Sequence, residues 1–186
     1  MSKDDVGPDL ASLREEWIHR GGARPDFARA PEKGQESVWD YPRPPALVKD
    51  TREVVVCLGG VELARSCHAL RVLETASPPT FYLPPEDVNT ELLHRGSGSS
   101  FCEWKGQATY WDAEVADNRE PGLAWSYEEP FSESAPLAGY FSFYPARADC
   151  SVDGEVVRAQ AGGFYGGWIT DEIVGPFKGE PGTGGW

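Results

Sequence analysis

Residues 52–66, REVVVCLGGVELARS, decide how this chain folds. An apolar run over residues 54–58 leads to Gly59-Gly60, and a second run follows in which apolar and polar residues alternate. Two glycines between such runs are typical of the tight turn of a β-hairpin. The stretch therefore predicts two antiparallel strands.

Short strands are predicted along much of the remaining chain. Residues 68–75 alternate, with Leu70 and Val72 set against Arg71. Three strands rich in aromatic residues are predicted in ATYWDAEV (108–115), LAWSYEEPF (123–131) and AGYFSFYP (138–145). A second hairpin is predicted in CSVDGEVVRA (150–159), with Asp153-Gly154 at its turn. The 186 residues include 21 glycines and 16 prolines, so the chain turns often. We therefore expect an all-β domain of short antiparallel strands, with Phe141 and Phe143 on a core face.

The N-terminal part of the chain predicts one short amphipathic helix over residues 9–20, DLASLREEWIHR. Its apolar stripe consists of Leu10, Leu13 and Trp17. Ser12 and Glu15 have the spacing of a capping box, and Gly21-Gly22 would end the helix.

The segment after this helix, residues 21–45, has no periodicity and several prolines, and so predicts an extended arm. Trp39 and Tyr41 are costly to leave in water, so we expect them to pack on the domain or on a second copy of the chain, which would form a homo-oligomer. We accordingly divide the chain into helix and arm, residues 1–45, and one all-β domain with a glycine-rich tail, residues 46–186.

Three connecting segments have their own signals. Residues 84–87, Pro-Pro-Glu-Asp, resemble the first turn of a short helix. Residues 94–100, HRGSGSS, predict a flexible loop. The tail over residues 162–186 is too rich in glycine for regular structure, and we expect Ile169 and Val174 to anchor it.

The net charge of −13, with no basic cluster, repels phosphate backbones and anionic lipid, so neither nucleic acid nor a membrane is an expected partner. No signal sequence and no apolar run of roughly 20 residues is apparent, and we predict a cytoplasmic protein. The four cysteines form no CxxC pair, so we expect free thiols, no metal site and no cofactor. They are Cys57, Cys67, Cys102 and Cys150.

Several separated motifs resemble a bacterial and fungal family catalogued as domain of unknown function 427. The resemblance spans roughly residues 36–186, and the motifs are ESVWDYPRPP, VLETASPPTFYLPPEDV, FCEWKGQATYWD, AWSYEEP, GYFSFYP, VDGE and GGFYGGWITDEIVGPFKGEPGTGGW. It implies a β-tent, or Mss4-like, fold, in which two small antiparallel sheets lean together and a pocket opens between them.

Two activities associated with this resemblance are not carried over to this chain. Other β-tent families, including many type B methionine sulfoxide reductases, hold zinc with two CxxC knuckles, which are absent here. One label of the family suggests nucleotidyl transfer, yet the sequence has no glycine-rich phosphate loop with its lysine and no compact acidic metal motif.

The stretch SFCEWKGQATYWD, residues 100–112, is the strongest candidate for chemistry. In one uninterrupted strand Cys102 and Lys105 would point to opposite faces. A bulge or turn at Gly106 would let them converge, and a nearby ammonium favours a thiolate. We predict that regular strand begins only after Gly106. We also expect Cys102 to be largely buried and slow to react, as a small apolar side chain would be.

Lys105 follows Trp104 and precedes a glycine, so it is poorly placed to remain fully solvated. We expect it to reach a carboxylate, with Asp87 the first choice and Glu86 and Asp112 the alternatives. His68 and His94 have no ligand at metal-binding spacing. A structural ion pair at Lys105 is the simpler interpretation.

Aromatic residues from separate strands suggest a concave surface, although they could equally fill the space between sheets. They are Tyr82, Tyr110, Trp125, Tyr127, Tyr140 and Tyr144. We predict that the domain binds a small molecule or peptide end, and the predicted binding residues are Tyr82, Asp87, Lys105, Tyr110, Trp125, Tyr127 and Tyr144. The main alternative is an enzyme that uses Cys102 or Lys105, with Asp87 as a further catalytic candidate. A third is a structural or interaction module.

Overall fold

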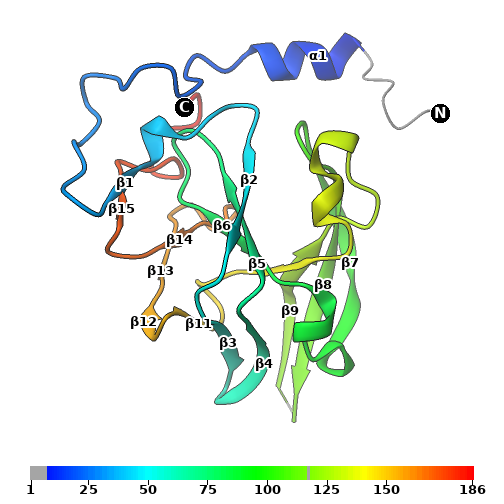
Figure 1. Ribbon diagram of the computed structural model, residues 1–186. Coiled ribbons are helices and arrows are strands. Elements are labelled where there is room, and N and C mark those ends of the chain that lie inside the picture. Colours follow the sequence, from blue (N-terminus) through cyan, green and yellow to red (C-terminus); the bar gives the residue numbers. More distant parts are fainter. Residues whose placement is uncertain (1–7, 117) are drawn as a thin grey trace.

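The computed structural model describes residues 8–116 and 118–186, and most of its regular structure is strand (Figure 1). The helices are α1 (Pro8–Glu15) and four 3₁₀ turns, η1 (Val38–Asp40), η2 (Pro85–Asp87), η3 (Thr90–Leu92) and η4 (Ser132–Leu137). The strands are β1 (Glu36–Ser37), β2 (Ala46–Asp50), β3 (Val54–Leu58), β4 (Val61–Ser66), β5 (Ala69–Leu73), β6 (Thr80–Tyr82), β7 (Leu93–Cys102), β8 (Gly106–Val115), β9 (Asn118–Ser126), β10 (Phe141–Phe143), β11 (Asp149–Val152), β12 (Glu155–Val156), β13 (Arg158–Ala159), β14 (Trp168–Ile169) and β15 (Ile173–Val174). The predicted all-β class is confirmed.

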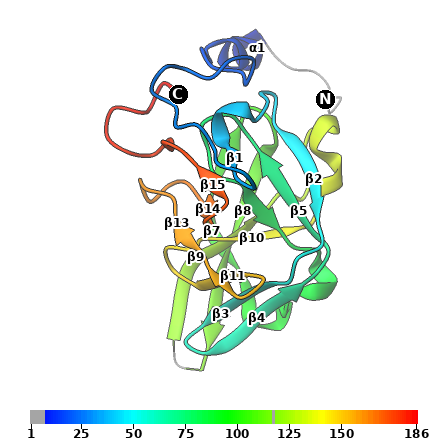
Figure 2. The same cartoon turned by 60° about the vertical axis from the view of Figure 1, so that its left-hand side comes forward.

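The strands are divided among more sheets than the two that the resemblance implied. Antiparallel sheets have the orders β10-β9-β8-β7, β12-β11-β3-β4 and β2-β5-β6, and the pairs β1-β15 and β13-β14 complete the set. In Figure 1, β7, β8 and β9 stand on the right, most other strands lie on the left, and α1 runs across the top; Figure 2 shows the same arrangement from the side. Prolines and glycines end many strands after a few residues, and this divides the structure into small sheets.

Both predicted hairpins form. Gly59 and Gly60 join β3 to β4 with φ angles of 58° and 81°. Asp153 and Gly154 join β11 to β12 with φ angles of 47° and 80°. Positive φ at both central residues is the geometry that suits the right-handed twist of the flanking strands, and the residue types at these turns meet it. The turn predicted after Pro84 is also present, as η2.

Two local predictions are wrong. Residues 94–100 are part of β7 rather than a loop, because β8 supplies hydrogen-bond partners to this edge strand, with a register shift between Arg95 and Ser99. The tail is anchored by Trp168 and Ile173, both buried, while Ile169 and Val174 are only partly buried. β14 pairs with β13 and β15 pairs with β1, and in each strand the buried side chain is one residue before the expected one.

The N-terminal helix is shorter than predicted. It ends at Glu15 rather than Arg20, and Ser12 lies inside it, so the capping box does not form. Of the predicted apolar stripe, Leu13 is exposed, while Leu10 and Trp17 are partly buried. The following residues leave the helix because Trp17 contacts the turn between β7 and β8.

The core lies between the sheets. Phe141 and Phe143 are buried, as their alternation predicted. The largest cluster brings together side chains from β3, β4, β6, β8, β9, β10, β11 and β14, among them Val54, Val56, Leu63, Phe81, Leu123, Phe143 and Trp168. Burying this apolar surface, at roughly 25 cal/mol per Å², is the main favourable contribution to folding.

The arm packs on the domain, which confirms one of the two expected docking places. Trp39 is 1% exposed, and its indole Nε1 donates a hydrogen bond to the carbonyl oxygen of Pro176 at 3.0 Å. Tyr41 is also buried, and β1 pairs in parallel with β15. The two rings are covered within the single chain, and oligomer formation through the arm stays a prediction.

A network of charged side chains joins the arm to the domain. Arg52 contacts Asp50 and Glu172, each at 2.6 Å. Arg71, which is buried, contacts Glu36 and Asp50 at 3.2 Å. Both guanidinium groups have carboxylate partners, and the Arg71–Asp50 pair is the most buried part of the network.

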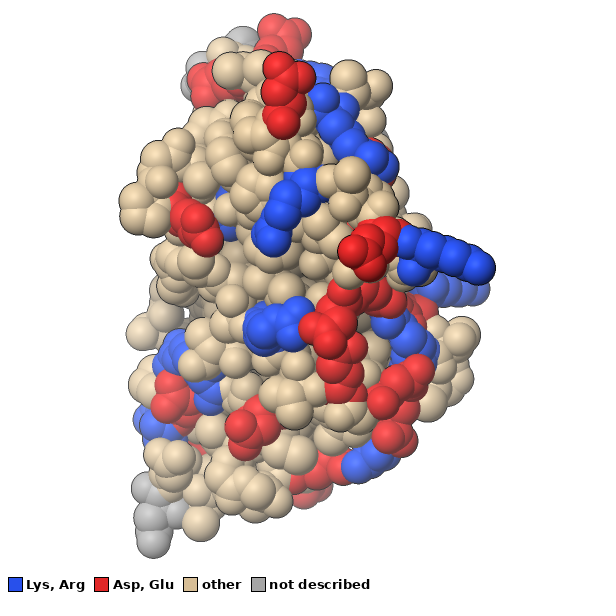
Figure 3. Space-filling view, turned by 90° about the vertical axis from the view of Figure 1, so that its left-hand side faces the viewer, with Lys and Arg blue, Asp and Glu red and all other residues tan. Residues whose placement is uncertain are grey.

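Surface charges of both signs are interspersed on the face drawn in Figure 3, with no broad basic patch. This distribution agrees with the low content of lysine and arginine in the sequence. Within the part of the chain that the structure describes, every helix is too short or too polar to be a membrane span.

Candidate functional site

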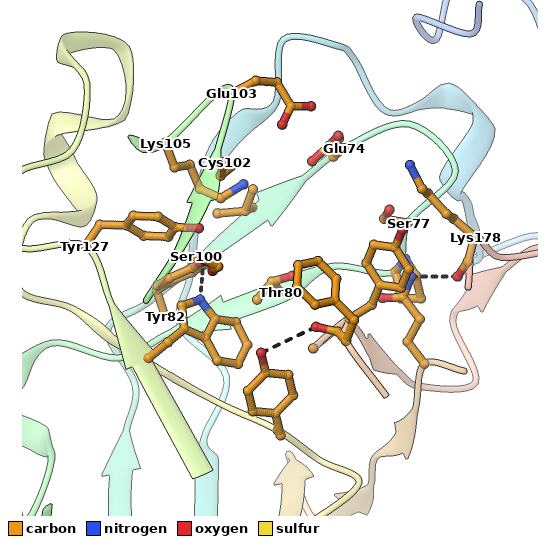
Figure 4. A pocket seen from close by; sticks show the side chains of 18 of the residues that line it. Glu74, Ser77, Thr80, Tyr82, Ser100, Cys102, Glu103, Lys105, Tyr127 and Lys178 are labelled. Atoms are coloured by element: carbon orange, nitrogen blue, oxygen red, sulfur yellow. Dashed lines mark hydrogen bonds between the residues drawn. The ribbon is translucent and has the colours of Figure 1, made fainter. Parts of the chain in front are cut away.

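A cavity of about 320 Å³ opens between the β10-β9-β8-β7 sheet and the β2-β5-β6 sheet (Figure 4). Residues of the C-terminal segment and Trp17 of the N-terminal segment complete its wall. Residues that line the cavity include Trp17, Val72, Glu74, Thr80, Tyr82, Ser100, Cys102, Glu103, Lys105, Tyr110, Trp125, Tyr127, Tyr144, Gln160, Phe164, Tyr165 and Lys178. Six of the seven predicted binding residues are among them.

The tight turn between β7 and β8 positions the charged end of this cavity. Cys102 pairs with Gly106 across the hairpin, and the amide of Lys105 donates a hydrogen bond to the carbonyl oxygen of Cys102 at 3.3 Å. Gly106 has a φ angle of 95°, a backbone conformation that residues with a side chain rarely adopt. Regular strand resumes at Gly106 itself rather than after it, and Cys102 still belongs to β7, but Lys105 lies in the turn between the two strands and is freed from strand alternation as expected. Cys102 and Lys105 consequently line one cavity.

Lys105 is a buried cation with no carboxylate of the described residues within ion-pair distance. It is 8% exposed, and among the described residues its Nζ forms no ion pair and no hydrogen bond to an oxygen or nitrogen atom. The Tyr127 ring centroid lies 6.0 Å from Nζ. Burial lowers the pKa of Lys105, while negative charge on Cys102, Tyr82 or Glu74 raises it, and the net direction is upward. The ammonium form is therefore the one that this environment holds.

The predicted carboxylate partners of Lys105 are wrong. Asp87 accepts a hydrogen bond from the Ser66 hydroxyl at 2.6 Å and lies 3.4 Å from His68 Nδ1. Asp112 pairs with Arg119 at 2.7 Å. Proximity along the chain misled the prediction, because β7 carries the turn at Lys105 to the opposite end of the hairpin from η2 and η3. Asp87 does not line the cavity and is withdrawn as a binding or catalytic candidate.

Cys102 is half-buried rather than largely buried, so that expectation is wrong. Cys102 is the last residue of β7 and lies at the cavity wall. Its side chain therefore has fewer packing neighbours than a residue inside a strand. Its slow reaction with thiol reagents stays a prediction on this geometry. The three remaining cysteines do not line this cavity.

The aromatic floor is held by its own contacts. Trp125 Nε1 donates a hydrogen bond to the Tyr82 hydroxyl at 3.0 Å, and the ring centroids of Trp125 and Tyr144 are 4.5 Å apart. The Tyr110 hydroxyl donates to Ser100 Oγ at 2.8 Å. Tyr140 packs against this group but does not line the cavity.

Burial raises the pKa of Tyr82 to about 12, while Lys105 opposes the shift. Burial also raises the pKa values of Tyr127 and Tyr144. All three hydroxyls therefore stay protonated near neutral pH and can donate hydrogen bonds. The floor offers flat apolar surface with donors at its edge.

The C-terminal segment closes the floor at close range. A Cβ at Gly166 would lie 2.1 Å from the Trp125 ring, so this approach requires glycine. The buried Gln160 donates from Nε2 to the carbonyl oxygen of Lys178 at 2.7 Å and accepts from the amide of Gly167. These contacts fix the tail, which was predicted to lack regular structure, as one wall of the site.

A second lysine, Lys178, was missed from the sequence. It is 5% exposed and lies on the other side of the view from Lys105 in Figure 4. Its Nζ donates to the carbonyl oxygen of Trp186 at 3.1 Å and lies 3.6 Å from the Trp17 ring centroid. Burial and the nearby Arg43 lower its pKa to about 8.

A sequence signal for Lys178 did exist. Both lysines follow an aromatic residue and precede a glycine with positive φ, Gly106 at 95° and Gly179 at 117°. A positive-φ glycine after a lysine takes that side chain out of strand alternation, which allows it to be buried at a turn.

The acidic side chains at the cavity have partners elsewhere. Glu74 pairs with Arg43 at 3.2 Å. Glu103 Oε1 accepts a hydrogen bond from Trp17 Nε1 at 2.9 Å. Neither carboxylate is within ion-pair distance of Lys105, although both line the cavity. Among residues 8–116 and 118–186, no group of three or more His, Cys, Asp or Glu side chains could hold a metal ion.

Fold and site together define an all-β domain with an aromatic cavity that contains buried lysines. Residues 46–154 match the family described as Domain of unknown function (DUF427), and this match covers more than half of the chain. The protein belongs to this family, as the sequence motifs predicted. Comparison with curated proteins gave no match.

Proposed function

We propose that this protein binds a small molecule or peptide end that presents an anionic group, such as a carboxylate, to Lys105 and lays a flat apolar group on the aromatic floor. The observation that supports the proposal most strongly is the buried Lys105 ammonium, which lines the cavity without a counter-ion from the described residues.

Burying a charge costs free energy. Removing an ammonium from water costs several kcal/mol unless an opposite charge or well-placed dipoles replace the lost hydration. Tyr82 and Tyr127 supply only neutral hydroxyls, and Glu74 and Glu103 are engaged by Arg43 and Trp17. An anionic ligand would provide an opposite charge for the Lys105 ammonium, which has already lost most of its hydration in the folded protein.

The apolar part of the ligand is inferred from the floor. Trp125, Tyr82 and Tyr127 are all largely buried around the cavity, and their rings are fixed by mutual contacts. Rigid aromatic side chains bind a flat group with little further loss of side-chain freedom. A volume of about 320 Å³ is at the low end of the range for ligand sites, which favours a small ligand.

The test compares three compounds of similar shape: phenylacetate, 2-phenylethanol and phenethylamine. We expect phenylacetate to bind most tightly in calorimetric titrations, because it alone pairs with Lys105. Lys105→Met removes the charge but keeps an unbranched side chain, and should abolish this preference. Lys49→Met, at an exposed lysine on β2, is the matched control and should keep it.

Two outcomes contradict the proposal. One is equal affinity for phenylacetate and 2-phenylethanol in the unmodified protein. The other is unchanged phenylacetate affinity in Lys105→Met, which would show that the anion binds elsewhere.

A further inference from the structure

Cys102 lines the same cavity as Lys105. The two residues leave one tight turn, closed by the hydrogen bond between the Lys105 amide and the Cys102 carbonyl oxygen at 3.3 Å. In Figure 4 the Lys105 side chain extends toward Cys102. A ligand held by Lys105 would thus lie beside a thiol that is half-buried and lines the cavity.

The side chains around Cys102 restrict the chemistry that it could perform. None of the three histidines lines the cavity, so Cys102 lacks the thiol–histidine pair that acyl transfer by cysteine generally uses. Exchange between a thiol and a disulfide needs no such partner, because the thiolate attacks sulfur directly and the leaving group is another thiolate.

We propose that Cys102 forms a mixed disulfide with small disulfides that carry a carboxylate, which Lys105 holds in place. This inference rests on the proposed anion site. The Cys102 thiolate attacks one sulfur of the small disulfide, a new S–S bond forms and the original S–S bond breaks. The departing thiolate takes a proton from solvent. Cys102 is oxidised, the departing sulfur is reduced, and the small disulfide is the only oxidant.

The mixed disulfide should persist until an external thiol removes it. No second cysteine lines the cavity, so no neighbouring thiol of the described residues can resolve the adduct. Cys67, in contrast, is exposed on the surface after β4 and lies outside the cavity. Cys67 therefore serves as an internal reference for a thiol that reacts with the same disulfide outside the cavity.

The experiment treats the fully reduced chain with three small disulfides: dithiodiglycolate, which is anionic, 2-hydroxyethyl disulfide, which is neutral, and cystamine, which is cationic. Mass spectrometry of peptides measures the modification rates of Cys102 and Cys67. We expect the ratio of the Cys102 rate to the Cys67 rate to be roughly tenfold higher for dithiodiglycolate than for the neutral disulfide, because one ammonium pairs with the anion. The net charge of −13 acts against this preference everywhere else on the surface.

Lys105→Met should remove the anion preference at Cys102, and Lys49→Met should keep it. The inference is overturned if the ratio of the Cys102 rate to the Cys67 rate is the same for dithiodiglycolate as for 2-hydroxyethyl disulfide, or if the preference survives in Lys105→Met. The comparison of three disulfides on the unmodified chain remains decisive even if a variant folds poorly.

A second variant separates this inference from the proposed function. Cys102→Ser should still bind phenylacetate reversibly, since Lys105 is intact. Phenylacetate binding without selective exchange at Cys102 overturns the exchange alone. Absence of phenylacetate binding in both the unmodified chain and Cys102→Ser overturns the anion site itself.

Discussion

The two faces of the β2-β5-β6 sheet hold buried charge in opposite ways. Arg71 on β5 points into the ion network with Asp50 and Glu36. Val72, the next residue, lines the cavity on the other face, where Lys105 has no ion-pair partner among the described residues. A buried charge that is paired within the chain is costly to deprive of its partner, whereas a buried charge in a cavity without a carboxylate partner is a candidate ligand site.

The largest expected effect is on the paired side. Arg71→Met leaves Asp50 and Glu36 with one cation fewer, and should lower the free energy of unfolding by about 3–5 kcal/mol, since removing one partner of a buried ion network leaves charge uncompensated. Urea denaturation measures the change. The matched control is Arg158→Met, whose exposed pair with Asp171 should contribute less than about 1 kcal/mol. Equal effects of the two substitutions would contradict the structural role of the network.

Acid should weaken the paired side in a defined range. Burial raises the pKa of Glu36, but hydrogen bonds from Arg71 and Tyr41 outweigh it and lower the pKa overall. Asp50 behaves in the same way through Arg52. Carboxyl groups with lowered folded pKa values contribute stability that is complete above their unfolded values, about 4.3 for Glu and about 3.9 for Asp, and is lost as the pH falls further.

The corresponding variant is Glu36→Gln. Between about pH 6 and about pH 3 it should lose less stability than the unmodified chain, because one of the titrating groups is gone. At neutral pH, Glu36→Gln should lower the free energy of unfolding by less than Arg71→Met does, because the other contacts of the network persist. Identical losses in both proteins would show that Glu36 has an ordinary pKa in the fold.

A smaller effect is expected in alkali from Lys178, whose folded pKa of about 8 lies below the ordinary lysine value. The unfolded chain then binds more protons than the folded chain between about pH 8 and about pH 10.4, so this lysine should make stability rise with pH in that range. Urea denaturation at about pH 7 and about pH 9.5 measures this increase in the free energy of unfolding, and the increase should be smaller in Lys178→Met. The same rise in both proteins would contradict the burial of a titrating Lys178.

Local patterns predicted much of the fold and part of the site. Gly59-Gly60, Asp153-Gly154 and Gly106 mark turns through the backbone freedom of glycine, a property that a sequence displays directly. Alternation placed Phe141 and Phe143 in the core, and the aromatic residues of separate strands were correctly assigned to one cavity, Tyr140 excepted.

What the sequence could not predict are contacts between distant segments. Lys178 and Trp17 meet at 3.6 Å from opposite ends of the chain, and no local pattern encodes that distance. The choice of Asp87 as a partner of Lys105 relied on nearness along the chain, while sheet pairing places that carboxylate beside Ser66. Edge pairing similarly turned the polar residues 94–100 into strand.

The central claim is that Lys105 is buried for a ligand and not for the fold. The most direct measurement is the free energy of unfolding of the unmodified chain and of Lys105→Met, each with and without phenylacetate. Without ligand, the substitution should change the free energy of unfolding by less than about 1 kcal/mol, because it leaves no carboxylate partner of the described residues uncompensated. With phenylacetate at roughly 100 times its dissociation constant, the unmodified chain should gain about 2.7 kcal/mol and the variant almost nothing. A loss in Lys105→Met as large as that in Arg71→Met, or equal stabilisation of both proteins by phenylacetate, would contradict the claim.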